Sequence, residues 1–532
     1  MEQFAFYGLK LISTGSGITF TPMKKFAAFF VLFLFTFALQ AQTLDERIAE
    51  IDAYAQKVMT DWHQPGMAIA IVKDDKVVFA KGYGTRELGK NDPVDADTDF
   101  AIASNSKAFT VASLAILVDE KKIGWNDKVT KYLPDFKLYD PYVTSELTIR
   151  DLVTHRVGLD TFSGDLLWYE TDYSSDEILQ RVRFLKPVSG FRTQFGYSNL
   201  MFIAAGKVIE KVSGKPWCNF VTEHFLSPLG MTRTTCSIKT LPENSAWPHN
   251  ESGGSLRVLQ RGNVDGAYSA AALNSNVNDL SKWMRLQLGK GKFEGKQIFS
   301  EAQAWGMHQP YLAQQISENS FRANPTRHFT GVASGWFVYD YQGRKIINHS
   351  GGLDGMLSYT HLIPEENLGF VVLTNSEYPV FTIMANKIRD IFVNAPKRDW
   401  NGEALEQAKR NKAAEAEAIK NADAARVPDT KPTLPLTGYA GSYSDELYGA
   451  VNIAEENGHL IMRFSHSPNF VADLAHWHFD TFQIKWRPSV AYNFPRGFVT
   501  FTIDKDGKTD ELKIDQPNSD FWFYELHPKR VK

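Results

Sequence analysis

The sequence predicts an α+β fold: an antiparallel sheet with helices plus a helical subdomain, followed by a small antiparallel β-barrel or sandwich. Near the N-terminus, apolar runs over 66–72 and 76–80 flank Asp74-Asp75, a pattern typical of a β-hairpin. Late in the same domain, four more strands are predicted over residues 335–341, 345–348, 357–363 and 369–374. Because helical patterns lie between these groups, we expect one sheet built from both extremes of the domain.

Composition divides the chain into four segments. We expect an upstream segment and signal peptide over 1–41, a catalytic domain over 42–398, a helical and Pro-rich linker over 399–436, and a β domain over 437–532. The stretch from Trp400 is rich in Ala, Glu and Lys and has few large apolar residues, which indicates an exposed helix. Beyond the linker, alternating apolar residues around tight Asn-Gly and Asp-Gly turns predict short antiparallel strands.

The N-terminal region has the features of a secretory signal peptide. Met23-Lys24-Lys25 precedes an apolar run over 26–39, and small and polar residues follow. The run is shorter than the roughly 20 residues of a membrane-spanning helix, so we expect no stable membrane span. The mature chain should begin at or near Gln42 and reside in the periplasm or outside the cell. Such a compartment would permit Cys218 and Cys236 to pair, although two separate buried thiols fit the sequence equally well.

Composition and motif content narrow the classes of partner. A net charge of −3 gives no electrostatic reason to expect nucleic acid. The chain has no C-x-x-C pair, H-E-x-x-H or P-loop motif, so we expect no metal and no cofactor. His466, His476 and His478 lie in the β domain, but no carboxylate or Cys spacing completes a metal site, and structural packing is the preferred interpretation.

The segment Ser104-Asn105-Ser106-Lys107 is a candidate nucleophile with its own base. A serine hydroxyl attacks efficiently only when another group removes its proton. Lys107, one helical turn after Ser104, can do so if burial lowers the pKa of its amine. Apolar residues follow and would provide that burial. The alternative is that Ser104 only caps a helix over 108–120 and that Lys107 is solvated.

Two later motifs strengthen the first. Tyr197-Ser198-Asn199 stands before an apolar helix predicted over 199–213, and Tyr197 could relay a proton while Asn199 could bind the substrate and Lys107. His349-Ser350-Gly351-Gly352 ends a predicted strand in small residues, which permit close approach of a substrate backbone. His349 could hold a substrate carboxylate when protonated, or tune Tyr197.

The three motifs, in this order, resemble the serine β-lactamase and penicillin-binding protein superfamily. The third has His where most members have Lys, so the chain resembles the branch around class C β-lactamases, family VIII-type esterases and D-aminopeptidases. The resemblance covers about 44–394 and implies a β-lactamase/transpeptidase-like fold. It also implies that the strand at His349 pairs with substrate and that the Gly352 amide is the second oxyanion donor. One departure is Ser189-Gly190-Phe191-Arg192-Thr193, which stands where the family often has Pro-Gly-Thr.

We therefore expect an exported serine hydrolase that forms an acyl-enzyme on an ester or amide of a small molecule or peptide. The alternatives are a penicillin-binding protein or sensor that is acylated with little turnover, and a weak β-lactamase. The β domain resembles the lipocalin-like module of unknown function that often follows such catalytic domains. We expect it to be tethered and dispensable for acylation; the other roles considered are covering the pocket and mediating homo-oligomer assembly.

Overall fold

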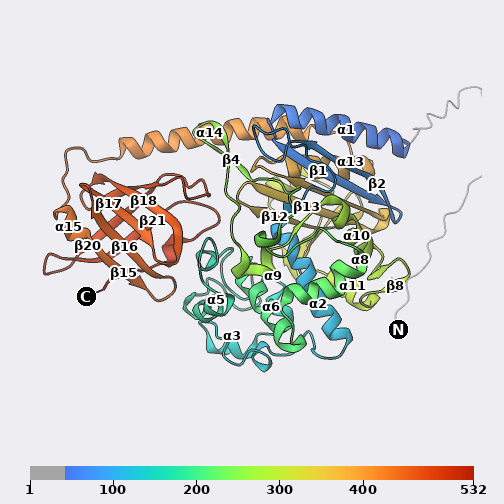
Figure 1. Cartoon of the computed structure of the whole chain (residues 1–532), viewed down its shortest axis with the longest axis horizontal. Coiled ribbons are helices and arrows are strands. Elements are labelled where there is room, and N and C mark those ends of the chain that lie inside the picture. The colour runs from blue at the N-terminus through green and yellow to red at the C-terminus, as the bar shows by residue number, and fades with distance from the viewer. Residues whose placement is uncertain (1–41, 532) are drawn as a thin grey trace, which may run out of the picture. The chain divides into compact units, whose positions relative to one another are not determined.

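The computed structural model describes residues 42–531, so the predicted signal peptide lies outside the described residues. At the centre of the catalytic domain is an antiparallel sheet with strand order β2-β1-β14-β13-β12-β11-β10-β9 (Figure 1). The early hairpin of β1 (Gly66–Lys73) and β2 (Lys76–Gly84) joins the sheet because β1 pairs with β14 (Leu368–Thr374). The remaining strands are β9 (Leu312–Gln314), β10 (Thr330–Val332), β11 (Phe337–Tyr341), β12 (Arg344–Leu353) and β13 (Met356–Ile363). The predicted sheet from both ends of the domain is confirmed.

Helices cover both faces of the sheet. On one face, α1 (Leu44–Asp61) and α13 (Val380–Phe392) pack in an apolar cluster with alternate residues of β1. On the other face, α10 (Val277–Leu288) and α2 (Ser106–Asp119) share a larger cluster with the intervening residues of β1. Helix α2 is buried on nearly its whole circumference, from Ser106 to Leu117, as expected for a helix that is apolar on all sides.

A helical subdomain lies beside the sheet and contains α6 (Asn199–Ser213), whose bounds agree with the prediction. Its other helices are α3 (Pro141–Glu146), α4 (Ile149–Leu152), α5 (Ser175–Arg181), α7 (Trp217–Val221), α8 (Ser227–Leu229) and α9 (Tyr268–Ala271). Cys218 in α7 forms a disulfide bond with Cys236, which decides between the two alternatives that the sequence left open. Smaller elements complete the domain: β3 (Phe100–Ala101), β4 (His249–Ser252), β5 (Ser255–Val258), β6 (Asn274–Ser275), β7 (Lys292–Phe293), β8 (Lys296–Gln297), α11 (Glu301–Met307) and α12 (Glu318–Ala323).

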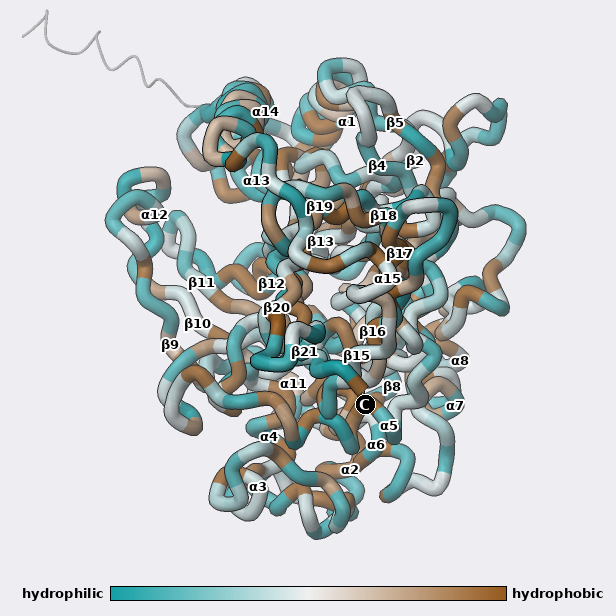
Figure 2. Tube along the Cα trace, turned by 90° about the vertical axis from the view of Figure 1, so that its left-hand side faces the viewer, coloured by the Kyte–Doolittle hydropathy of each residue, from teal (hydrophilic) through white to brown (hydrophobic). Residues whose placement is uncertain are grey.

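The C-terminal β domain is a closed antiparallel barrel, which selects the barrel over the sandwich. Its strands are β15 (Gly441–Asp445), β16 (Gly449–Glu456), β17 (His459–Phe464), β18 (Ser467–His478), β19 (Thr481–Trp486), β20 (Gly497–Ile503), β21 (Thr509–Asp515) and β22 (Lys529–Arg530). Aromatic rings fill the interior, among them Phe464, Phe470 and Phe523. Hydrophobic residues are frequent along the strands of the sheet and the barrel, as the brown stretches in Figure 2 show.

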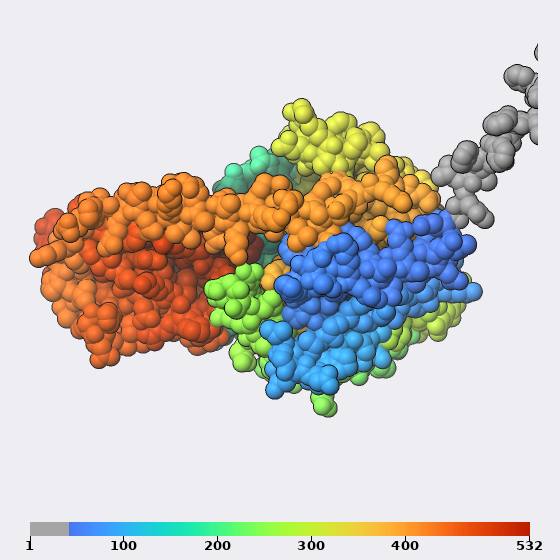
Figure 3. Space-filling model, turned by 90° about the horizontal axis from the view of Figure 1, so that it is seen from above, coloured from blue at the N-terminus to red at the C-terminus, as the bar shows by residue number. Residues whose placement is uncertain are grey.

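The predicted exposed helix of the linker is confirmed as α14 (Trp400–Ala424), in which only Asn401 is buried. The Trp62 indole donates to Asn401 at 2.8 Å and fixes the start of α14 beside α1. The C-terminal end of α14 contacts the barrel through an ion pair between Asp423 and Arg496. Figure 3 shows α14 as a continuous orange ridge from α1 to the barrel, where α15 (Leu436–Tyr439) follows. Among the described helices, none has the length and apolar character needed to cross a membrane.

Candidate active site

Ser104 lies in a short 3-10 turn, η1 (Ala103–Asn105), directly before α2. The preceding Ala103 has a φ of 51°, a left-handed conformation that is costly for a residue with a Cβ and that often occurs at functional sites. Strand β12 passes so close that a Cβ at Gly351 would lie 2.0 Å from the Ile102 carbonyl oxygen and 2.7 Å from the Ser104 nitrogen. A glycine is therefore required at position 351 for β12 to lie beside Ser104.

Lys107 is fully buried, and its ammonium nitrogen lies 3.0 Å from Ser104 Oγ. It also donates to Asn199 Oδ1 at 2.7 Å and to the Ala270 carbonyl at 3.0 Å. Burial lowers the pKa of Lys107 to about 7, while the charge of Asp165 opposes this shift. A neutral amine has two N–H groups and one lone pair. The two fixed acceptors occupy the N–H groups, and the lone pair is left for the proton of Ser104. This burial excludes the alternative of a solvated lysine.

Asp165 determines how Asn199 is oriented. The Asn199 amide nitrogen donates to Asp165 Oδ2 at 2.6 Å, so its oxygen is directed to Lys107. Asp165 begins the 3-10 turn η3 (Asp165–Leu167), and burial raises its pKa to about 8. Interactions with the side chains of Trp168 and Asn199 oppose this rise in pKa. Asp165 belongs to none of the three motifs and was not among the predicted site residues.

Tyr197 is buried beside the same serine. Its hydroxyl forms a hydrogen bond with Ser104, and burial raises its pKa above the ordinary value, so it is protonated at neutral pH. The ring stacks on His155 with centroids 4.2 Å apart. His155 Nδ1 accepts a hydrogen bond from the Ser198 amide, and burial holds its pKa well below the ordinary value. Neutral His155 therefore fixes the Tyr197 ring but carries no charge. Lys107, rather than Tyr197, is the group that can accept a proton near neutral pH.

Strand β12 has one free edge at the third motif. Its pairing with β11 ends at Asn348, whereas its pairing with β13 continues to Leu353. Residues 349–353 therefore have an edge available to an extended substrate. His349 is 2 % exposed, its Nδ1 lies 2.5 Å from the Ser350 carbonyl oxygen, and its Nε2 has no partner. Burial and the charge of Lys107 lower the pKa of His349 to about 3.

The contact of His349 Nδ1 with a carbonyl requires a proton on that nitrogen. A neutral ring then has an unprotonated Nε2, so His349 is a hydrogen-bond acceptor. Two roles were predicted for His349. Tuning Tyr197 needs no charge on the imidazole, and the two ring centroids lie 6.1 Å apart. The carboxylate-holding role requires a charged imidazole and stays without support in this geometry.

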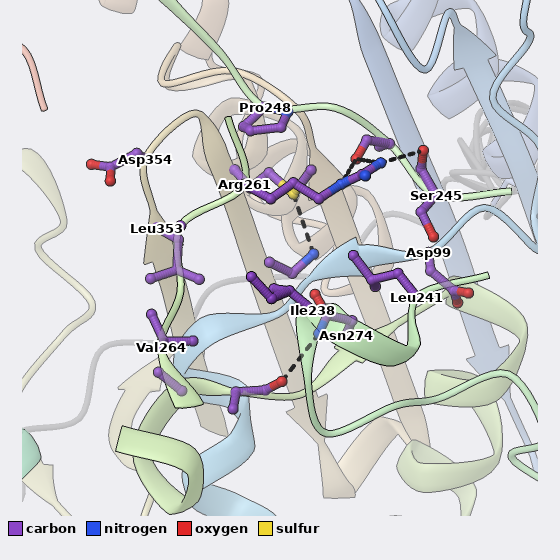
Figure 4. A pocket seen from close by; sticks show the side chains of 16 residues that line it. Asp99, Ile238, Leu241, Ser245, Pro248, Arg261, Val264, Asn274, Leu353 and Asp354 are labelled. Atoms are coloured by element: carbon purple, nitrogen blue, oxygen red, sulfur yellow. Dashed lines mark hydrogen bonds between the residues drawn. The ribbon is translucent and has the colours of Figure 1, made fainter. Parts of the chain in front are cut away.

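A cavity of about 680 Å³ brings the predicted residues together. Ser104, Tyr197, Asn199, His349, Ser350 and Gly352 line it. Lys107 lies behind Ser104, and Gly351 packs against the Ser104 backbone. A separate cavity of about 20 Å³, shown in Figure 4, lies next to it and shares Ala271, Leu353 and Asp354 with its lining. The smaller cavity holds none of the motif residues.

The barrel contributes to the large cavity, whereas we had expected a tethered module that is separate from the site. Tyr492, Asn493, Asp520 and Phe521 are part of its lining. These residues lie on loops between barrel strands, and their approach to Ser104 depends on the tertiary structure, so no local pattern could have identified them. Of the two other roles considered for the module, covering the pocket agrees with this arrangement.

The barrel also contacts the loop that supports the catalytic residues. The Trp522 indole donates to the Thr161 carbonyl at 2.5 Å. Glu525 accepts from Ser163 Oγ at 2.5 Å and from the Gly164 amide at 2.8 Å. The same loop leads to Asp165, and it holds the Tyr197 backbone through bonds from the Tyr197 amide to Thr161 Oγ1 and from the Phe162 amide to the Tyr197 carbonyl. The barrel thus stabilises the turn that places both Asp165 and Tyr197.

Comparison with known proteins assigns the family. The Beta-lactamase family model matches residues 51–392, and a domain of unknown function, DUF3471, matches residues 425–528. The chain therefore belongs to the β-lactamase family, and the predicted β-lactamase/transpeptidase-like fold is confirmed.

Similar proteins include hydrolases. Unguisins hydrolase ungD' of Aspergillus campestris is 31% identical over 439 residues, which are 77% of this chain and 78% of that protein. Protein flp of Staphylococcus aureus is 29% identical over 338 residues, 62% of this chain and 64% of its own length. Among solved structures, the octameric penicillin-binding protein homologue from Pyrococcus abyssi has a TM-score of 0.59 at 19% identity and covers 91% of this chain and 100% of its own. EstCE1, a hydrolase with promiscuous acyltransferase activity, has a TM-score of 0.56 at 18% identity. The match covers 66% of this chain and 99% of EstCE1. Family and relatives support a hydrolase of the serine type.

Proposed function

We propose that this protein is an exported serine hydrolase that cleaves an ester or amide through an acyl-enzyme at Ser104. The observation that carries the proposal is the contact of Lys107 with Ser104, in a setting where burial lowers the pKa of Lys107 to about 7 and two fixed acceptors occupy its other hydrogen-bonding positions. A base with a pKa near the working pH is the most effective general base.

In the proposed acylation, Ser104 Oγ attacks the carbonyl carbon while its proton passes to Lys107 Nζ. The carbonyl oxygen becomes an oxyanion, which the amides of Ser104 and Gly352 would stabilise. The intermediate collapses, and the leaving group takes a proton that Tyr197 relays from Lys107. Water then attacks the acyl-enzyme, with the same two residues handling its proton, and releases the acid and free Ser104.

The site favours esters and amides without a terminal carboxylate. None of the described residues that line the cavity is Lys or Arg, and the neutral His349 supplies no positive charge. Penicillins and peptides that end in D-Ala carry a carboxylate, which in this cavity would meet no cation. A penicillin-binding sensor and an efficient β-lactamase are therefore less well supported than an esterase or a peptidase with another specificity. A relative named as a hydrolase of unguisins agrees with hydrolytic turnover.

The proposal of export rests on the signal peptide predicted before Gln42 and on the disulfide between Cys218 and Cys236. Disulfide bonds form and persist mainly in oxidising compartments. N-terminal sequencing of the native protein from cell fractions tests export, and an intact Met23 terminus in the cytoplasm would contradict it.

Labelling with a fluorescent fluorophosphonate tests the catalytic proposal. We expect wild-type protein to be labelled and to hydrolyse p-nitrophenyl esters with release of one nitrophenol per turnover. Ser104→Ala should lose both properties, while the exposed Ser145→Ala should keep both. Labelling without turnover would support the sensor instead. Substantial turnover by Ser104→Ala would exclude Ser104 as the nucleophile.

A further inference from the structure

The cavity beside Ser104 has an unusual charge distribution. Four carboxylates line it, namely those of Asp165, Asp354, Glu377 and Asp520, and no described lining residue is a Lys or Arg. Burial, together with the charges of Glu377, Glu170 and Asp520, raises the pKa of Asp354 to about 7, although a hydrogen bond from Tyr169 opposes the shift. Like charges that share a poorly solvated space destabilise one another. The arrangement therefore favours any ligand that brings positive charge.

The cations nearest to this wall are committed elsewhere. Arg257 acts electrostatically on Glu377, but its guanidinium donates to Asn250 Oδ1 at 2.9 Å and to the Ala491 carbonyl at 3.4 Å. Arg261 lines the neighbouring small cavity and donates to the carbonyls of Ser245 and Ala246. Figure 4 shows the guanidinium of Arg261 directed toward Ser245, while the Asp354 carboxylate lies at the opposite side and points away from it.

Aromatic rings from both domains surround the carboxylates. Tyr169 donates to Asp354 Oδ2 at 2.5 Å and stacks on Phe521 of the barrel with centroids 4.1 Å apart. Tyr492 of the barrel donates to Asp520 Oδ2 at 2.9 Å, and its ring lies 5.2 Å from that of Phe521. Carboxylates combined with ring faces are a suitable environment for an organic ammonium group, which binds by charge and by cation–π attraction.

One buried acceptor of the cavity lining has no partner within the protein. His349 is 2 % exposed and lines the cavity, and its Nε2 has no hydrogen-bond partner. His349 lies on β12, which ends directly before Asp354. Its Nε2 is an acceptor, since it is an unprotonated ring nitrogen. It would accept an N–H group of a bound substrate.

We propose that Asp354, Asp520 and the rings of Tyr169, Tyr492 and Phe521 form a subsite for an organic ammonium group of the substrate. The proposal rests on the proposed hydrolase function and specifies its substrate class: an ester or amide that carries a cationic amine. The barrel supplies three of the five residues, so the subsite exists only when the barrel is packed on the catalytic domain. The described residues hold no group of three or more His, Cys, Asp or Glu side chains that could hold a metal ion, which favours an organic cation over a metal.

Matched substrates test the charge requirement. The purified full chain is assayed with two pairs of butyryl-type esters that differ only in a trimethylammonium group or a tert-butyl group of nearly equal shape. In one pair this group is on the alcohol, and in the other it is on the acyl chain of a p-nitrophenyl ester. We expect kcat/KM to be about tenfold higher for the cation than for its neutral isostere in at least one pair, the effect of one desolvated cation–π and charge contact.

Variants locate the effect. Asp520→Asn and Asp354→Asn should each reduce the cation-to-neutral ratio toward one. The matched control is Asp515→Asn, because Asp515 is an exposed barrel residue on β21 that does not line the cavity, and it should keep the wild-type ratio. A ratio near one in the wild type, a ratio unchanged in both subsite variants, or a ratio that depends on added Ca²⁺ or EDTA would overturn the subsite.

Failure of the subsite and failure of the hydrolase proposal are distinguishable. If the neutral esters are hydrolysed and fluorophosphonate labels Ser104, the hydrolase proposal holds and only the ratio decides the subsite. If no ester is hydrolysed and no label is incorporated, the proposed function itself fails, and the subsite fails with it as a substrate site.

Discussion

The two walls of the active-site cavity come from different parts of the chain and differ in how their polar groups are held. On the catalytic wall, Lys107 has three hydrogen-bond partners, and Asn199 is fixed between Lys107 and Asp165. On the barrel wall, Asp520 and Asn493 are at least partly exposed, and aromatic rings make up much of the surface. From this difference we propose that the catalytic wall sets the rate of bond cleavage, and that the barrel wall, together with Tyr169 and Asp354, contributes to which substrates are bound.

Removing the base tests the catalytic wall most severely. Lys107→Ala should lower kcat/KM by about 10⁴-fold or more, because a nucleophile and its base act as a unit. Lys121→Ala, a change of an exposed lysine just after α2, is the control and should keep wild-type kinetics. In the wild type, kcat/KM for a neutral ester should rise with pH and level off above about 7, since the pKa of Lys107 is lowered to about 7 and only its neutral form accepts the serine proton. A flat profile between pH 5 and 9 would contradict Lys107 as the base.

Glu525 tests whether the barrel also supports the catalytic wall. Glu525→Gln removes one of the two acceptors for Ser163 and Gly164, and it should lower kcat roughly tenfold with little change in KM, because small displacements of catalytic groups are costly. The Glu525 charge raises the pKa of Asp165. Without it Asp165 ionises more readily, which raises the pKa of Lys107, so the rising limb of the pH profile should move to higher pH. An unmoved limb would leave Glu525 with a purely structural role.

The control for Glu525 is Glu455→Gln, an exposed position on β16 of the same barrel. It should leave both kcat and the pH profile unchanged. If both barrel variants lower activity equally, the effect comes from general loss of barrel stability, and the contact with the catalytic loop has no specific role.

The disulfide should affect stability but not chemistry, and it is the smallest expected effect on turnover. Cys218 and Cys236 do not line the cavity. Replacing both by Ser reopens a loop of 18 residues, which should lower the free energy of unfolding by about 3 kcal/mol. The melting temperature of the reduced wild type and that of the double variant should both be lower than that of the oxidised wild type. We expect kcat at low temperature to be unchanged. An unchanged melting temperature in both cases would show that the bond does not constrain the unfolded chain.

Much of the catalytic wall could be predicted because its residues occur in short motifs with local causes. Ser104 and Lys107 are one helical turn apart. The apolar pattern of residues 199–213 predicted α6 correctly, and Ser198 caps this helix by accepting from the Met201 amide. The sheet followed from apolar runs bounded by turn residues. These features depend mainly on neighbours in the sequence.

The remainder depends on contacts between distant segments. Asp165 lies 34 residues before Asn199 in a short 3-10 turn, and nothing in its local sequence marks it as a partner of an amide. Strands β9 and β10 have only three residues each, too few to produce a periodic pattern. The β domain was predicted as a barrel or a sandwich, but the approach of Phe521 to Tyr169 results from docking of two domains, which a single sequence does not encode locally.

Helix α14 connects the catalytic domain to the barrel. It has only one buried residue, so most of its positions can vary without disturbing a core. Because barrel loops line the cavity, changes in those loops would alter selectivity while the catalytic motifs stay unchanged. Two relatives with identical Ser, Lys and Tyr motifs need not share a substrate, since part of the selectivity would be inherited with the barrel. Transfer of a substrate name between such relatives requires comparison of the barrel loops as well as of the motifs.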